Sequence, residues 1–180
     1  HRFFTSFEAS SSTATDLPGQ RTQLSLIDLI DISDADAESD VIVSGSFSRS
    51  ANNVSKLQWY SVIDDEGSVV DPLSGSILKP GEPGYATAAA RSADLISDNV
   101  LQLEDSVIAP FSITLKGGST YAPLITNEAT DDQFFAFAAA NTDGLAHFTR
   151  FGTNRWGVED VFGGGDRDYD DIIVRFSLST

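Results

Sequence analysis

The sequence predicts an all-β fold, an antiparallel, jelly-roll-like β-sandwich with one short helical insert. About eight short segments rich in β-branched and aromatic residues alternate with turns of Gly, Pro, Asn and Asp, as in sandwich proteins. One stretch, Tyr85 to Ile96, has the Ala-rich composition of a helix and follows a Pro-Gly pair. The chain has 180 residues, 41% of them hydrophobic, which is enough for one domain with a real core.

The expected strands follow one another along the chain. The apolar stretch from Leu24 to Ile32 fits either a kinked strand or a short helix, because periodicity does not separate the two here. Residues 57–63, the turn at 64–67 and residues 68–70 predict a hairpin. The other strands are expected at residues 41–47, 106–115, 121–126, 133–140, 146–151 and 172–178. We interpret residues 1–180 as a single domain, with a leader or edge segment at 1–20 and an insert of loop and helix at 80–97.

The charge excludes several classes of partner. The chain carries 27 acidic and 11 basic residues, for a formal net charge of -16, and 20 of the acids are Asp. Nucleic acids and anionic membrane surfaces would repel such a chain. There is no apolar run of the roughly 20 residues that span a bilayer, so no membrane insertion is expected. The absence of Cys excludes disulfides and thiolate sites, so a bound metal is the obvious staple for a small extracellular domain.

The densest acidic segment predicts a calcium site. Six carboxylates lie within residues 159–171, and three consecutive glycines at 163–165 let the backbone bend tightly around a small object. Calcium requires about 6–8 oxygen ligands, and unpaired carboxylates at this density would repel one another. The expected ligands are Glu159, Asp160, Asp166, Asp168, Asp170 and Asp171.

The loop does not match the known repeated calcium motifs. In an EF-hand register, Asp171 stands where Gly is needed and Ser177 stands where the bidentate Glu is needed. The residues that follow read as a strand, and the Gly-Gly-x-Gly-x-Asp unit is not repeated. The sequence therefore predicts a calcium loop that leads into a terminal strand.

Weaker oxygen-rich positions leave alternatives open. Asn141 and Asp143 are metal candidates, but Asn-Thr-Asp-Gly is equally a turn that closes a hairpin. The acidic run at 34–40 is either a solvated loop or a second cation site. The weaker metal candidates are Asp34, Asp36, Asn53 and Glu128.

No pattern of catalytic residues is present, so the chain is not expected to be an enzyme. His147, the only internal histidine, is more often structural in such a position. There is no nucleophile elbow, His-Glu-x-x-His pair or phosphate-binding loop. Glu159 and Asp160 are a poor glycosidase pair, because adjacent residues on a strand point to opposite faces.

The segment from Phe134 to Phe176 closely resembles the C-terminal half of an extracellular domain family of giant bacterial RTX adhesins. It contains Asn-x-Asp-Gly, His, Gly-x-Asn, aromatic-Gly-x-Glu-Asp and Gly-Gly-Gly-Asp-x-Asp in the order of that family. Upstream landmarks are Arg49-x-Ala51-x-Asn53, Trp59-Tyr60 and residues 78–85, so the resemblance covers about residues 40–178. Asp170 departs from it, because the family often has Asn there; an oxygen donor is kept.

The resemblance implies an extracellular, cell-surface module, monomeric within a long fibrous chain, that mediates adhesion and biofilm contacts. Some relatives in that family use an exposed calcium to hold a peptide C-terminus. The expected ligand-binding residues are Asn154, Trp156 and Tyr169, although aromatic rings in such positions often belong to the core or rim. Two alternatives remain, a calcium-dependent glycan-binding module and a calcium-rigidified spacer.

Overall fold

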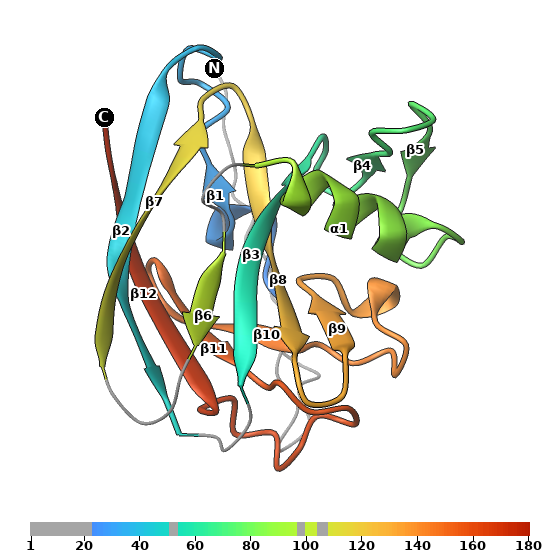
Figure 1. Cartoon of the computed structure of the whole chain (residues 1–180), viewed down its shortest axis with the longest axis vertical. Coiled ribbons are helices and arrows are strands. Elements are labelled where there is room, and N and C mark those ends of the chain that lie inside the picture. Colours follow the sequence, from blue (N-terminus) through green and yellow to red (C-terminus); the bar gives the residue numbers. More distant parts are fainter. Residues whose placement is uncertain (1–22, 51–53, 97–99, 104–107) are drawn as a thin grey trace, which may run out of the picture.

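Two antiparallel sheets form the body of the protein in the computed structural model, which describes residues 23–50, 54–96, 100–103 and 108–180 (Figure 1). The first sheet has the order β10 (Phe148–Gly152), β11 (Arg155–Val158), β12 (Ile172–Ser179), β2 (Asp40–Arg49) and β7 (Ala109–Lys116). The second has the order β1 (Ile30–Asp31), β8 (Thr120–Asn127), β3 (Ser55–Val62) and β6 (Leu101–Leu103), and β9 (Asp132–Phe135) also pairs with β8. The predicted all-β sandwich is confirmed.

Smaller elements complete the fold. The helix α1 spans Tyr85–Asp94, and two short 3-10 helices lie at η2 (Leu26–Asp28) and η3 (Ala138–Ala140). The strands β4 (Val69–Val70) and β5 (Ile77–Leu78) pair only with each other in the described part of the chain, and Figure 1 shows them beside α1, away from the first sheet.

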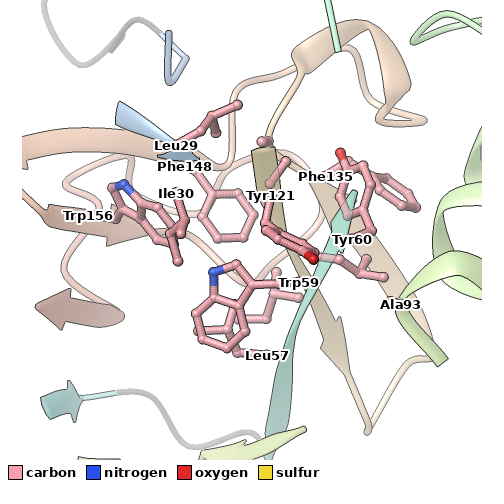
Figure 2. Packing of buried hydrophobic residues seen from close by; sticks show 14 of the residues in the cluster. Leu29, Ile30, Leu57, Trp59, Tyr60, Ala93, Tyr121, Phe135, Phe148 and Trp156 are labelled. Atoms are coloured by element: carbon pink, nitrogen blue, oxygen red, sulfur yellow. The ribbon is translucent and has the colours of Figure 1, made fainter. Parts of the chain in front are cut away.

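Aromatic residues on β3 fill both faces of the second sheet. Trp59 lies between the sheets, with its ring centroid 6.1 Å from that of Phe111 on β7. Tyr60 points the other way, toward Phe135 and Ala93 of α1 (Figure 2). Its ring contacts those of Tyr85 and Phe135 edge to face, with centroid distances of 6.4 and 5.9 Å. Because both faces of β3 are buried, the strand lacks the apolar and polar alternation of a half-exposed strand.

The helix covers the outer face of β3. Its buried side is mostly alanine (Ala88, Ala89 and Ala93), and such small side chains let a helix approach a sheet closely. Tyr85 anchors its first turn by donating a hydrogen bond to the carbonyl of Gly67 at 2.8 Å. The insert therefore packs on the sheet as part of the core.

The predicted hairpin of β3 with residues 68–70 is correct only at its turn, where the Ile63 N–H donates to the carbonyl of Ser68 at 2.9 Å. The turn exists, since Gly67 has φ +86° and its N–H donates to the carbonyl of Asp64. However, β4 pairs with β5, and the neighbours of β3 are β6 and β8. The expected strand at 133–140 is also only half correct, because β9 ends at Phe135 and η3 follows. Leu24 to Ile32 contains both η2 and the short strand β1.

Replacing Gly45 with Ala should destabilise the first sheet. Gly45 lies in β2 between β12 and β7, and an added Cβ would overlap the backbone carbonyl oxygen of Arg175. Since strand backbone cannot move aside cheaply, Gly45→Ala should lower the free energy of unfolding by about 1–3 kcal/mol, measured by urea denaturation. Gly152→Ala is the matched control, because its nearest neighbour would be 3.9 Å away. Equal effects of the two substitutions would contradict this account.

Candidate metal centre

The acidic loop connects β11 to β12 and runs along the bottom of the view in Figure 1. Its backbone is left-handed at Gly163, Gly164 and Gly165, and also at Arg167 and Tyr169, where φ is 62°. A Cβ on Gly165 would lie 2.6 Å from Oε2 of Glu159, so only glycine allows this approach. The loop therefore folds back over Glu159, as the three glycines predicted.

Glu159 lies at the centre of this loop. It is 1% exposed, and its Oε1 accepts a hydrogen bond from the Tyr169 N–H at 2.8 Å. Its Oε2 is buried and accepts no N–H or hydroxyl in the described part of the chain, and the carboxyl group of Asp171 lies within hydrogen-bonding reach of the Glu159 side chain. Burial, assisted by the carboxylates of Asp171 and Asp166, raises the pKa of Glu159 to about 8. An unpaired buried carboxylate oxygen is costly, so a missing partner is indicated.

Two further carboxylates face the same point. Glu159, Asp166 and Asp168 each place an oxygen within 4.8 Å of the others, and Asp166 and Asp168 are exposed. Calcium–oxygen distances of about 2.3–2.6 Å put opposite ligands roughly 5 Å apart, so one ion can contact all three. Among the described residues, this is the group of three acidic side chains whose oxygens lie close enough together to hold one metal ion.

Asp168, Asp170 and Asp171 continue the acidic surface. Asp168 Oδ1 accepts the Asp170 N–H at 3.1 Å, and this bond holds the pKa of Asp168 below its usual value. The pKa of Asp170 is raised, chiefly by its contact with the carboxyl group of Asp168. Burial and the charge of Asp160 raise the pKa of Asp171. Neighbouring carboxylates and burial therefore raise the pKa values of Asp170 and Asp171, whereas the backbone bond lowers that of Asp168.

Asp160 has a structural task in addition to any metal role. Its Oδ2 lies 3.0 Å from Nη2 of Arg49 and accepts the Ser55 hydroxyl at 2.7 Å, and both charged side chains are fully buried. Arg49 ends β2 in one sheet and Ser55 begins β3 in the other. The side chains of Glu159 and Asp160 thus have different partners.

Asn141 and Asp143 lie outside the three-carboxylate group. Asn141 is 6% exposed and binds the backbone of Phe135 through both its amide oxygen and its amide nitrogen. Asp143 accepts hydrogen bonds from Gly163 N and from Nε2 of His147, each at 2.9 Å. These bonds hold the pKa of Asp143 below its usual value despite burial, which acts in the opposite direction. Both residues therefore have structural partners, and their role as metal ligands stays a prediction.

The three expected ligand-binding residues have different surroundings. Trp156 lies among the core side chains near Phe148 (Figure 2), is 1% exposed, and donates from its Nε1 to the carbonyl of Asp28 at 2.8 Å. Its ring belongs to the core, which corrects the expectation that it contacts a ligand. Asn154 is exposed in the turn between β10 and β11 with φ 52°. Tyr169 is 3% exposed and donates its hydroxyl to the carbonyl of Ala146 at 2.8 Å.

Among the described residues, Asp34, Asp36 and Glu128 belong to no group of three acidic side chains that could hold an ion. Asp34 and Asp36 are exposed, and Oδ1 of Asp36 accepts the Glu38 N–H in a local turn. Glu128 accepts a hydrogen bond from Gln102. Asn53 lies outside the described residues. The solvated-loop alternative for residues 34–40 fits this arrangement better than a second cation site.

Sequence reasoning missed the buried partners of the site. The sequence marks Arg49 only as part of the family resemblance, and no pattern singles out Ser55 as a partner of Asp160. Arg49 and Asp160 are 111 residues apart in the chain, so no local pattern joins them. The available signal was a charged side chain at the end of an apolar strand, which must find a counter-ion if it is buried.

One family matches part of the chain. The sequence model described as a domain of unknown function, DUF4114, matches residues 111–179, from β7 through the acidic loop to β12. Neither the curated proteins nor the solved structures gave a match. Among the described residues, no helix is both long and apolar enough to cross a membrane.

The stability of the metal-free protein should fall as the pH rises from about 4.5 to about 8. The pKa of Glu159 is about 8 when folded, above its ordinary value of 4.5. The contribution of this group is therefore fully present below about pH 4.5 and is lost as the pH passes through about 8. Thermal unfolding in metal-free buffer measures the effect, which Glu159→Gln should reduce. Asp65→Asn, an exposed acid outside the loop, should leave it unchanged. A slope that Glu159→Gln does not alter would contradict this assignment.

Proposed function

We propose that this protein is a calcium-dependent adhesion module of a bacterial cell-surface RTX adhesin, binding peptide or protein C-termini through loop-bound calcium. The observation that carries the proposal is the buried Glu159, whose Oε2 accepts no N–H or hydroxyl and which places one carboxylate oxygen within 4.8 Å of oxygens of Asp166 and Asp168. A cation at this point would coordinate oxygens of all three carboxylates and neutralise part of their charge.

The donor set favours calcium over softer metals. All three side chains offer carboxylate oxygen, whereas zinc and copper sites normally include imidazole or thiolate ligands. In the described part of the chain, the nearby His147 is occupied by Asp143 and by the carbonyl of Glu159. An irregular loop with left-handed residues also suits the flexible coordination of calcium better than the strict octahedron of magnesium.

The position of the site supports a binding role. Glu159 is buried, but Asp166 and Asp168 are exposed, so an ion held by them lies at the surface. Three side-chain carboxylates leave calcium several coordination positions short of its usual shell. A carboxylate at the end of a peptide can take such positions, and loop backbone groups can read the adjoining residues.

Calcium should bind to the wild-type protein and raise its thermal midpoint, because a ligand that binds only the native state stabilises it. Glu159→Gln should weaken calcium binding by about tenfold or more, as measured by isothermal titration calorimetry. Asp65→Asn removes the same charge from an exposed position outside the loop and should leave the affinity unchanged. Unchanged melting on chelation, or equal effects of the two variants, would refute the metal site.

Peptides with free C-termini should bind in calcium and dissociate in chelator, and amidated peptides should not bind. A peptide array measures this, with a glycan array as the parallel experiment. Calcium-dependent binding to glycans alone would replace the peptide ligand with a sugar, and binding to neither would identify a spacer.

A further inference from the structure

We propose that the pocket beside the acidic loop receives a compact apolar side chain from the C-terminal residue whose carboxylate lies at the ion. The proposal rests on the proposed function and deepens it by naming the ligand class. The pocket has a volume of about 210 Å³ and lies between residues 144–146 and the segment of the loop from Gly164 to Tyr169.

The pocket and the carboxylate cluster are parts of one structural unit. Gly164, Arg167 and Tyr169 line the pocket, and Asp166 and Asp168 alternate with them along the same loop. The Tyr169 N–H binds Oε1 of Glu159, so the residue that forms one wall also fixes the buried metal ligand. A ligand held at the ion would therefore have the pocket beside it.

The lining favours a small apolar group. Ala138, Leu145 and Ala146 supply aliphatic surface, and the ring of Tyr169 is fixed among them by its hydroxyl bond to Ala146 O. None of the described lining residues is acidic, although the whole chain has a formal charge of -16. An apolar cavity of about 150 Å³ holds benzene, so this pocket accommodates a valine or leucine side chain.

Asp143 accepts hydrogen bonds from both segments that form the walls of the pocket. Asp143 accepts the Leu145 N–H at 3.1 Å on one side and the Gly163 N–H at 2.9 Å on the other. His147, fully buried and stacked on Phe134, fixes Asp143 in turn. Asp143 is thus a positioning residue, and a pocket whose walls are already ordered loses less entropy when a ligand binds.

Arg167 supplies a positive charge at the rim. The side chain lies over Gly164, since its Nε would be 3.5 Å from a Cβ there. Within the described chain, its guanidinium has no hydrogen bond or ion pair. A carboxylate between the ion and Arg167 would satisfy both, because a guanidinium binds a carboxylate through two parallel hydrogen bonds. Charge and shape together select an anionic group next to a short apolar one.

The direct test uses three small probes on the calcium-loaded protein, titrated by NMR. N-acetylleucine carries both the carboxylate and the apolar side chain, N-acetylglycine lacks the side chain, and N-acetylleucinamide lacks the carboxylate. N-acetylleucine should bind about tenfold or more tightly than either of the others, because burying its side chain removes four carbons from water. Equal affinity of the leucine and glycine probes, or no binding by any probe, would overturn the pocket assignment.

Variants separate the pocket from the ion. Leu145→Trp should fill the pocket and abolish the preference for N-acetylleucine without changing the calcium affinity. Leu73→Trp is the matched control, because Leu73 is exposed in the turn between β4 and β5. It should leave both the probe preference and the calcium affinity unchanged. Arg167→Gln should weaken both carboxylate probes, and Arg167→Lys should weaken them less. If Leu145→Trp retains the preference, the proposed pocket is wrong.

The positioning role of Asp143 has its own readout. Asp143→Asn should narrow the ratio of leucine to glycine affinity while calcium affinity stays within about threefold of wild type, because an amide nitrogen then faces the Gly163 N–H. An unchanged ratio would remove Asp143 from the proposal. If the wild-type protein does not bind calcium, the proposed function is refuted. If it binds calcium but has equal affinity for the leucine and glycine probes, only the pocket is refuted.

Discussion

The buried ion pair between Arg49 and Asp160 is the interaction on which this end of the molecule depends. It joins the end of β2 in one sheet to the segment after β11, and Ser55 and Asn127 bind the same residue from the other sheet. Removing one partner of a fully buried pair typically costs about 3–5 kcal/mol, since the other charge is left without compensation. Because Glu159 directly precedes Asp160, the ion pair also determines where the carboxylate of Glu159 lies.

His147 and Asp143 form a second, smaller support on the opposite side of Glu159. The histidine binds the carbonyl of Glu159 through Nδ1 at 2.7 Å, and Asp143 through Nε2. The glutamate is therefore held through its own carbonyl, through Tyr169 and through its neighbour Asp160. These contacts keep the carboxylate buried, and its burial beside Asp171 and Asp166 raises its pKa.

The long elements of the fold could be predicted from the sequence, and the short ones could not. Strands β2, β3, β8 and β12 have eight to ten residues, and α1 has ten, so their composition was sufficient. The two-residue strands β4 and β5 carry no periodicity, which is why the partner of Val69 was assigned wrongly. In the site, spacing and glycines located the acidic loop, but could not show which oxygens meet. The roles of Asp160 and Trp156 depend on Arg49 and Asp28, which lie more than a hundred residues away in the chain and come near only through folding.

Arg167 occupies a left-handed backbone position with φ 62°, next to three glycines that adopt such angles freely. A side chain there costs about 1 kcal/mol relative to glycine, and neither burial nor a hydrogen bond from its guanidinium offsets that cost within the described chain. Optimising the sequence for stability alone would place glycine or asparagine at this position. Stability and binding therefore make opposing demands on one residue, and a more stable variant with glycine at position 167 would lack the only cationic group that lines the pocket among the described residues.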